Sequence, residues 1–404
     1  MAPRAPAQVL AVVTASHFMQ HLFMGTSVLF PLIVGELGLT YTEFGLAMSA
    51  FALVSGLMQA LFGAASRRVA RRVLLGLGNF LLALGTLLTG LSRSLLDFLA
   101  ARLISGIGSA SYHPVGTAIV SEHSSERSLG RAIGLYYGLA YVGNVIGPAL
   151  ATALALALGW RGALLSLSLP IFALSPLALW RLSGAGAAAP AAGRGLWSSV
   201  AGLLRTKGVL AILAAQVALS GGAEIGILTT YVPVFLGNFL RMDVQERGLA
   251  YAAALLGGAL GPIAIGSYAQ RLGYVRSAAI AMSIASALTL LLIPYGPGAC
   301  VALVTAHLFA LMFVSFSLST LLQAQLVRLT SGYDRDLVVG LFFTVLFSSS
   351  SLWMGLVGYI IDLYSSFRPA LALMGCLTLL APALLLAMGG TRSGPLGLGA
   401  DRRP

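Results

Sequence analysis

Two ionisable side chains lie deep inside long apolar runs of the sequence, where charges are otherwise rare. Arg102 stands in the run around residues 95–120, and Glu224 stands in the run around 209–235. A charge at the centre of a membrane-spanning helix costs about 2.5–3.5 kcal/mol on insertion scales, which indicates a use for each. A buried carboxyl that also senses a positive charge can bind and release a proton. The alternative is structural: Arg102 satisfied by backbone carbonyls and Asp97, and Glu224 permanently protonated.

Histidines follow the same pattern, because four of the five lie inside apolar runs. His17 and His21 are four residues apart, so they share one helix face, with Gln20 beside them. No third His, Asp, Glu or Cys stands near this pair in the sequence, and a metal site is not predicted. Each histidine alone is typical of a hydrogen-bonded interior residue, but the set favours a polar pathway. The residues that we expect to line a substrate cavity are His17, Gln20, Tyr112, His113 and Gln216.

The depth of four of these residues can be compared along their helices. A rise of about 1.5 Å per residue in a hydrocarbon core about 30 Å thick places His21, Arg102, Glu224 and His307 in one layer, somewhat outside the midplane. These four are the predicted proton-coupling residues.

The elements that must hold these side chains are membrane helices. Of the 404 residues, 58% are hydrophobic and 9% are charged, against about 45–50% and about 25% in soluble domains. The apolar residues form long runs instead of alternating, which indicates helices and excludes a barrel. Twelve spans of about 20 residues account for nearly the whole chain. We expect them at 9–34, 43–65, 73–91, 95–120, 131–158, 162–180, 209–235, 246–268, 277–295, 299–327, 337–361 and 369–388.

Only one connection between spans is long, and it divides the chain into two halves. Residues 1–180 form the N-terminal half, 181–208 a cytoplasmic linker, 209–388 the C-terminal half and 389–404 a cytoplasmic tail. Most of the 24 lysines and arginines fall in loops on one side, which the positive-inside rule assigns to the cytoplasm. We therefore expect a multi-pass inner (plasma) membrane protein with both termini in the cytoplasm. This orientation accounts for the net charge of +12 without nucleic acid as a partner.

A basic loop occurs at the same place in each half. The loop after the second span contains Gly63, Arg68, Arg71 and Arg72, and the loop after the eighth contains Gly266, Arg271 and Gly273. Since Gly266 follows Gly63 by 203 residues in a chain of 404, we expect two pseudo-symmetric six-helix halves of common origin.

The two loops resemble the signature of the major facilitator superfamily, and the resemblance covers the whole chain. Arg67 and Gln270 stand where that signature has an acid, so an acid-dependent contact does not carry over to the first loop. The segment that begins Arg102-Leu-Ile-Ser is similar to the family's buried-arginine motif. The residues that resemble the signature of proton-coupled drug antiporters are Gly134, Gly143, Gly147 and Pro148. Close packing and a bend of the fifth span are the commoner explanation for these glycines.

A narrower likeness connects the sequence with the fosmidomycin-resistance branch of that family. It is carried by Ser16-His17, by residues 106–114 and by the segment that begins at Gly340. Members of the branch export drugs in exchange for protons, and in the superfamily spans 1, 4, 7 and 10 line the central cavity. The resemblance implies that Arg102, Glu224 and the histidines face this cavity.

We therefore expect a secondary transporter that exports a small drug-like or anionic compound by alternating access, driven by proton influx. An importer or uniporter of a small metabolite is the alternative, and a transport-dead receptor is a more remote one. The sequence contains neither a phosphate-binding loop nor the motifs His-Glu-x-x-His and Gly-x-Ser-x-Gly, so it predicts neither an ATP-driven pump nor an enzyme. The expected partners are the substrate, protons and the lipid bilayer. We expect a monomer without a cofactor.

Overall fold

The computed structural model describes residues 6–66, 68–124, 129–182, 196–333 and 335–387, and within these ranges the chain is helical, without strands. The elements in chain order are α1 (Pro6–Gly25), η1 (Thr26–Leu29), α2 (Phe30–Leu37), α3 (Tyr41–Ala65), α4 (Arg71–Leu91), α5 (Leu95–Ser109), η2 (Tyr112–Gly116), α6 (Thr117–Glu122), α7 (Leu129–Arg181), α8 (Leu196–Arg205), α9 (Val209–Ser220), α10 (Ile225–Val234), η3 (Phe235–Phe239), α11 (Val244–Leu272), α12 (Tyr274–Leu290), α13 (Val301–Leu329), α14 (Arg335–Tyr364) and α15 (Phe367–Ala387).

The helices account for all twelve predicted spans. In the described ranges, nine helical stretches are long and apolar enough to cross a membrane. One of them, α7, contains the fifth and sixth spans, which meet at Gly159, where a φ of 70° bends the chain. The fourth span is α5, η2 and α6 in succession, and the ninth is the 17-residue α12. The predicted all-helical fold class is therefore confirmed.

Corresponding helices in the two halves start in the same way. Thr40 caps α3 and exchanges hydrogen bonds with Glu43, while Asp243 caps α11 and exchanges hydrogen bonds with Glu246. Both pairs are capping boxes, which satisfy two free N–H groups at a helix start. Asp243 follows Thr40 by 203 residues, the same offset as the basic loops. The repeat thus extends from the loops to the starts of the second and eighth spans.

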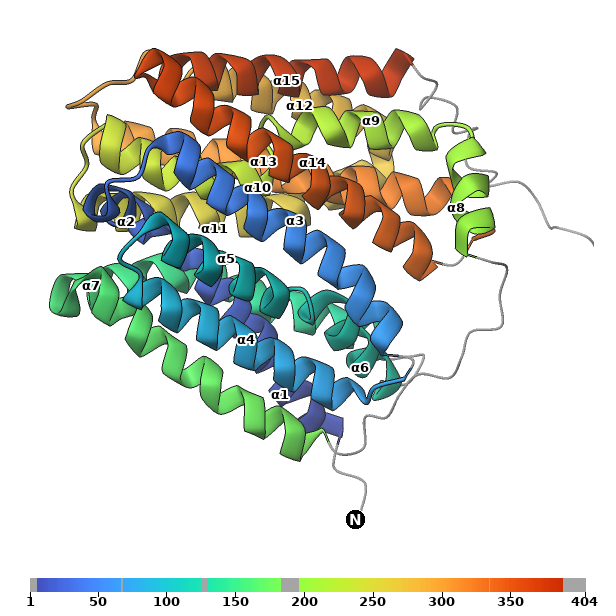
Figure 1. Ribbon diagram of the computed structural model, residues 1–404. Coiled ribbons are helices and arrows are strands. Elements are labelled where there is room, and N and C mark those ends of the chain that lie inside the picture. Colours follow the sequence, from blue (N-terminus) through green and yellow to red (C-terminus); the bar gives the residue numbers. More distant parts are fainter. Residues whose placement is uncertain (1–5, 67, 125–128, 183–195, 334, 388–404) are drawn as a thin grey trace, which may run out of the picture.

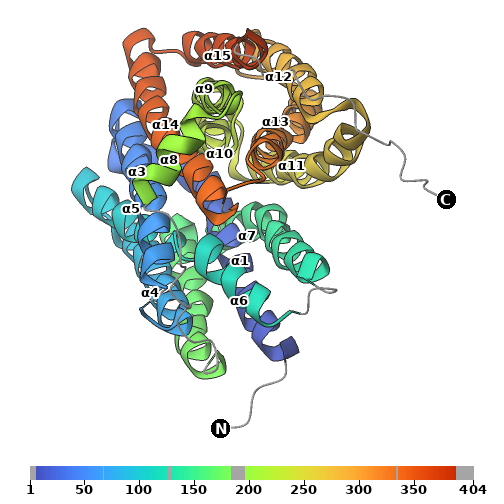
Figure 2. The same ribbon diagram turned by 90° about the vertical axis from the view of Figure 1, so that its right-hand side faces the viewer.

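The helices gather into two groups (Figures 1 and 2). Elements α1 to α7 form the N-terminal half, and α9 to α15 form the C-terminal half. Elements α6 and α8 lie at one end of the molecule, on the right in Figure 1, and α2 lies at the other. We call the first the basic end, because the loop with Arg68, Arg71 and Arg72 lies there, and the second the α2 end.

Hydrogen bonds between described residues of the two halves lie towards the α2 end. Asp362 of α14 accepts hydrogen bonds from the backbone N–H groups of Tyr41 and Thr42, at 3.0 and 2.6 Å, and from the Thr42 hydroxyl at 2.5 Å. The hydroxyls of Ser27 and Tyr251 are 3.0 Å apart. These bonds join η1 and the start of α3 to α11 and the end of α14. The α2 end is therefore closed.

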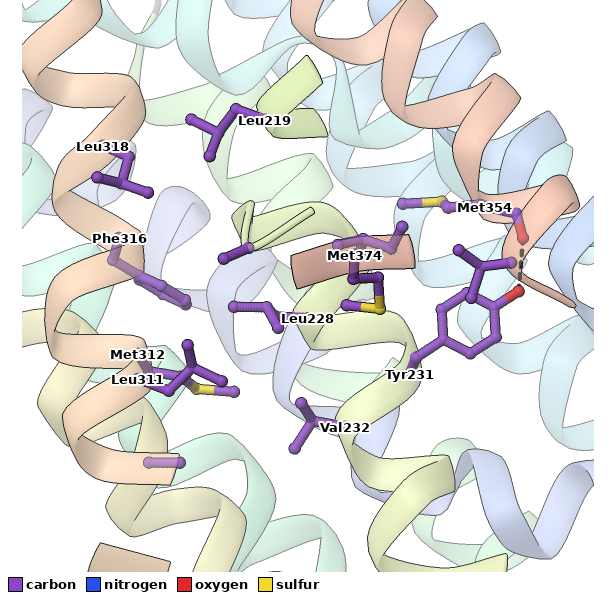
Figure 3. Packing of buried hydrophobic residues seen from close by; sticks show 14 of the residues in the cluster. Leu219, Leu228, Tyr231, Val232, Leu311, Met312, Phe316, Leu318, Met354 and Met374 are labelled. Carbon is purple, nitrogen blue, oxygen red and sulfur yellow. Dashed lines mark hydrogen bonds between the residues drawn. The ribbon is translucent and has the colours of Figure 1, made fainter. Parts of the chain in front are cut away.

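Buried apolar side chains fill each half, and apolar side chains also cover the outside. Figure 3 shows part of the core, where the Tyr231 hydroxyl donates a 2.5 Å hydrogen bond to the carbonyl of Met354. On the outer surface, Ile263 and Leu352 are 72% and 76% exposed. Large exposed apolar residues along many helices fit contact with lipid instead of water.

The predicted linker at 181–208 is partly helical, which the sequence analysis did not anticipate. It contains α8, whose Leu203 is 1% exposed and whose Gly202 lies against Tyr333. Composition alone predicts a connection here, because the few apolar residues of this short helix follow a run of alanines and glycines. Residues 183–195 of the linker and the predicted tail at 389–404 lie outside the described ranges.

Candidate functional site

The predicted pair His17 and His21 forms the centre of a buried polar cluster. His21 Nδ1 lies 3.0 Å from Asn144 Oδ1, and His21 Nε2 lies 3.2 Å from His17 Nε2. If Nδ1 of a neutral His21 donates to Asn144, its bare Nε2 accepts a hydrogen bond from His17. His17 is fully buried, and its Nδ1 has no partner among the described residues. This order leaves the Nδ1 lone pair of His17 free to accept a proton or a ligand hydroxyl.

Aromatic rings from two other elements surround His17. The ring centroids of Tyr136 and Tyr137, both on α7, lie 4.5 and 5.3 Å from that of His17. From η2, the rings of His113 and Tyr112 lie at 5.3 and 6.3 Å. The third histidine of the sequence prediction thus joins the first two, and Tyr112 stands beside them.

A second layer of hydrogen bonds fixes this cluster. The Tyr112 hydroxyl donates to Asn79 Oδ1 at 2.9 Å, and Asn79 Nδ2 donates to Ser16 Oγ at 3.0 Å. The Tyr136 hydroxyl donates to the carbonyl of Tyr112 at 2.7 Å. Asn79, Tyr136 and Asn144 were not among the predicted site residues, although a polar side chain inside an apolar run is a signal that marks such positions.

The glycines of the fifth span bring α7 against α1. A Cβ added at Gly143 would lie 2.5 Å from the carbonyl oxygen of Phe18, and one at Gly147 would lie 2.8 Å from that of Leu22. The backbones approach so closely only because both positions lack a side chain. Gly134 has open space where its Cβ would be, and Pro148 continues α7 next to Gly25. This contact holds Asn144 beside His21.

Arg102 of α5 lies in an aromatic cage and has no carboxylate partner among the described residues. Its Nη2 donates a 2.8 Å hydrogen bond to Thr89 Oγ1, and its Cζ lies 5.1, 5.9 and 5.5 Å from the ring centroids of Phe23, Phe51 and Phe98. Rings facing a desolvated cation stabilise it by about 2 kcal/mol. The alternative that Asp97 satisfies Arg102 is wrong, because the Asp97 carboxylate accepts from the backbone N–H of Arg93 at 3.0 Å.

Glu224 lies where the seventh span is broken. Helix α9 ends at Ser220 and α10 begins at Ile225, and Glu224 is the N-cap of α10. Its Oε2 accepts a 2.7 Å hydrogen bond from the N–H of Gly226 and lies 3.5 Å from the Ser350 hydroxyl. The side chain is 2% exposed. A carboxylate at a helix N-terminus is stabilised by the free N–H groups and the helix dipole.

The turn between α9 and α10 is held by two other helices. The N–H of Ala223 donates to Thr378 Oγ1 of α15 at 2.8 Å. A Cβ at Gly221 would lie 2.5 Å from the Trp353 ring of α14, and Trp353 Nε1 donates to the carbonyl of Val217 at 2.9 Å. Gly221 thus allows close packing against α14, and Gly222 against α15.

One face of α14 connects the histidine cluster with Glu224. The Phe343 ring stacks on His113 with centroids 5.8 Å apart, and Ser350 approaches Glu224. Phe343 and Ser350 are seven residues apart, which is about two turns and roughly 10 Å along the same helix face. His113 and the Glu224 carboxylate therefore lie along one stretch of α14.

The remaining predicted residues are more scattered. His307 lies between α13 and α12, where its Nε2 is 2.8 Å from the carbonyl oxygen of Leu288 and its Nδ1 is 3.2 Å from the Tyr295 hydroxyl. Gln20 donates to the carbonyl of Ser109 at 3.5 Å, and Gln216 donates to the Ser220 hydroxyl at 3.2 Å. Among the described contacts, no two of His21, Arg102, Glu224 and His307 touch each other.

The basic loops are built differently in the two halves. Arg71 is 7% exposed and forms an ion pair with Glu122 at the end of α6, while Arg67 lies outside the described ranges. In the second loop, Gly273 joins α11 to α12 with a φ of 92°, a conformation that favours glycine. Cβ atoms at Gly266 and Gly273 would meet no atom within 4 Å, and one at Gly63 would reach only Pro114, at 3.9 Å.

Solved structures of similar fold are transporters. A bacterial homolog of the human lysosomal transporter Spinster, in an inward-facing and occupied conformation, has a TM-score of 0.74 and 18% identity, with 97% of this chain and 98% of that chain covered. The nucleoside transporter NupG has a TM-score of 0.78 and 13% identity, with 94% and 100% covered. The TM-scores show a common fold, and at these sequence identities the likeness shows the fold alone.

Curated relatives match shorter segments. The "Probable L-galactonate transporter" of Escherichia coli (strain K12) is 34% identical over 87 residues, which is 22% of this chain and 19% of that protein. The "Probable sulfoacetate transporter SauU" of Cupriavidus necator is 32% identical over 110 residues, which is 27% of this chain and 26% of that protein. The chain thus matches only about a fifth to a quarter of their lengths.

The family comparison covers most of the chain. The model described as Major Facilitator Superfamily matches residues 12–354, which includes the histidine cluster, Arg102, Glu224 and both basic loops. Together with the twelve helical spans, this match shows that the chain belongs to the Major Facilitator Superfamily.

Proposed function

We propose that this transporter moves a small organic anion by alternating access and couples that movement to a proton carried by Glu224. The observation that carries the proposal is the position of this carboxylate. It is a buried acid inside a span, at the N-cap of a broken helix, without a cation beside it among the described residues. A carboxylate so placed is charged while it caps α10 and loses much of that interaction when it binds a proton.

Proton binding at Glu224 is in this way linked to the break between α9 and α10. The ionised carboxylate holds the first turn of α10 through Gly226 and approaches Ser350 of α14. Charge-assisted hydrogen bonds are about twice as strong as neutral ones. Protonation weakens both contacts, and the free N–H groups at the start of α10 then need another partner. We propose that this weakening favours the conformation in which Glu224 faces the opposite side of the membrane.

An anionic substrate fits the charge of the central residues. Arg102 is a cation without a carboxylate partner among the described residues. The neutral histidines add hydrogen-bonding atoms, among them His17 Nδ1, which has no partner among the described residues. The names of both curated relatives refer to acids, galactonate and sulfoacetate. We propose that the substrate contacts the cluster of His17, His21 and His113. Such a compound offers carboxylate or sulfonate oxygens and hydroxyl groups to histidine N–H and tyrosine O–H donors.

We propose export in exchange for protons as the direction. It rests on the glycine pattern of the fifth span, which resembles that of proton-coupled drug antiporters. The likeness of Ser16-His17, residues 106–114 and the segment that begins at Gly340 to the fosmidomycin-resistance branch supports the same direction. With the basic end in the cytoplasm, the closed α2 end leaves substrate loading to the cytoplasmic side.

The test is transport by purified protein in liposomes with an imposed pH gradient. A panel of labelled organic acids that includes galactonate and sulfoacetate is screened first. Glu224→Gln should then lose uphill transport yet keep downhill exchange. The amide oxygen of Gln can still cap Gly226, so the variant removes the titration and keeps the cap. Glu246→Gln is the matched control, because it alters a capping-box carboxylate at the start of α11.

Three results would overturn the proposal or one of its parts. Uphill accumulation by Glu224→Gln would mean that another group carries the proton, with His21 or His307 the next candidates. Transport of neutral compounds, with rejection of every acid in the panel, would contradict the proposal that the substrate is an anion. If a proton gradient that is acidic outside drives the substrate into inverted vesicles, substrate and protons move in the same direction. Such symport would mean import into the cell in place of export.

A further inference from the structure

A pocket of about 390 Å³ opens at the α2 end, apart from the central residues. Its lining comes from both halves of the molecule. Tyr41 contributes from the start of α3, Asn238 and Arg241 from the chain around the end of η3, and Asp362, Ser365 and Phe367 from the junction of α14 and α15. The volume is large enough for a compound of one or two fused rings.

The pocket wall includes the hydrogen bonds that close the α2 end. Asp362 accepts from the N–H of Tyr41 at 3.0 Å, and Asn238 Nδ2 donates to the Tyr41 hydroxyl at 3.3 Å. Tyr41 belongs to the N-terminal half, and both of its partners belong to the C-terminal half. If the halves separate at this end, the lining comes apart. A compound bound in the pocket is therefore bound to the closed state alone.

Backbone strain is concentrated at the same place. Among the described residues, the only non-glycine residues with positive φ are Arg241, at 60°, and Ser365, at 48°. Both line the pocket. Left-handed backbone costs a residue with a Cβ roughly 1 kcal/mol or more, and such residues cluster at ligand sites, where the surrounding structure holds them. The two strained residues belong to separate loops, yet they meet at one cavity.

The chemistry of the lining selects an anion with a flat apolar body. The guanidinium of Arg241 is exposed and has no hydrogen bond or ion pair with a described residue. The Asp362 carboxylate already accepts three hydrogen bonds from the start of α3, two from backbone N–H groups and one from the Thr42 hydroxyl. The Phe239 and Phe367 rings, with centroids 5.6 Å apart, supply an apolar wall. An aromatic carboxylate would satisfy the arginine and cover these rings.

We infer that this pocket is a regulatory site for small aromatic carboxylates, which enter from the α2 side and hold the two halves closed at that end. Occupancy keeps the α2 end closed and so slows the transport cycle. The site is separate from the proposed proton and substrate residues. Its test needs no transported substrate and is independent of the proposed function.

Binding is measured by equilibrium dialysis of the purified protein against labelled 2-naphthoate, with the neutral 2-naphthamide as a matched compound. We expect saturable binding of the carboxylate. Arg241→Gln should weaken it roughly fivefold, the value of one exposed charge pair. Arg368→Gln is the control, because Arg368 is an exposed arginine that follows Phe367 but does not line the pocket.

Closure is measured with a cysteine at Ser27, which is 4% exposed and forms one of the contacts between the halves at the α2 end. All modification rates are compared with that of the Ser27→Cys protein itself. Cys300 and Cys376 are first replaced by serine, and a membrane-impermeant thiol reagent is added on the α2 side. At a concentration near the Kd of the unsubstituted protein, 2-naphthoate should slow modification of the new cysteine, and Arg241→Gln should show a smaller slowing at the same concentration.

Three outcomes would overturn the inference. They are the absence of saturable binding at millimolar concentrations, equal loss of binding in Arg241→Gln and Arg368→Gln, and unchanged or faster modification at Ser27→Cys when 2-naphthoate is bound.

Discussion

The contact between Asp362 and the start of α3 should set how often the α2 end opens. The carboxylate accepts three hydrogen bonds, at 3.0, 2.6 and 2.5 Å, and it faces the positive end of a helix from the other half. Asp362→Asn keeps the shape but removes the charge and one acceptor oxygen. Charged hydrogen bonds contribute about 1.5–3 kcal/mol each, and a carboxylate at a helix start about 0.3–2 kcal/mol. In the open state, hydrogen bonds to water replace part of this free energy.

We expect Asp362→Asn to lower the stability of the closed α2 end by about 2 kcal/mol, which is about 30-fold in the equilibrium constant. The reagent test at Ser27→Cys measures this directly, because the modification rate follows the open fraction when opening is fast. The rate should rise by the same factor. Glu43→Gln is the matched control, since Glu43 accepts from Thr40 at the same helix start, but from within its own half. Equal rates in wild type and Asp362→Asn, or an equal rise in Glu43→Gln, would refute the reasoning.

The other predictions concern single side chains of the two halves. Arg102→Lys should insert normally but lose at least about tenfold of coupled transport, because an ammonium cannot stack on three rings as a guanidinium does; full transport would reduce Arg102 to a structural residue. Gly143→Ala should lower stability by about 1–3 kcal/mol through overpacking against α1, seen as a lower melting temperature in detergent, while Gly134→Ala should leave it nearly unchanged. His307→Ala should keep the response to a pH gradient and melt earlier, because it loses its bonds to α12 and Tyr295; loss of coupling with normal melting would instead make His307 a proton carrier.

Much of the fold could be predicted from the sequence, because lipid leaves few choices for an apolar run. A run of about 20 apolar residues must be a helix, so the twelve spans followed from composition and length. Breaks inside spans were harder to place. Gly159 bends a helix that otherwise continues from Leu129 to Arg181, and the turn before Glu224 depends on packing against Trp353 and Thr378. These contacts come from distant parts of the chain.

The candidate site was predicted in part for the same reason. A charge or histidine inside an apolar run is visible at once, and this signal found His17, His21, His113 and Glu224. Their neighbours depend on which helix faces which. Asn144 is 123 residues from His21, and no local pattern joins them. The depth of a residue along a helix also does not say which neighbour its side chain faces. His307 was predicted at the depth of Glu224, yet its side chain contacts α12.

The close approach of α1 and α7 has a consequence for movement between the two states of the cycle. His17 and His21 on α1, and Tyr136 and Asn144 on α7, belong to helices whose backbones touch at Gly143 and Gly147. Such a pair has no room to slide, so these four side chains travel as a rigid set when the halves rock. Phe343 belongs to the other half, and its stacking on His113 is one of the ring contacts between the halves that change in this movement. A substrate held by the histidines would thus keep the same binding partners on both sides of the membrane and exchange only one wall.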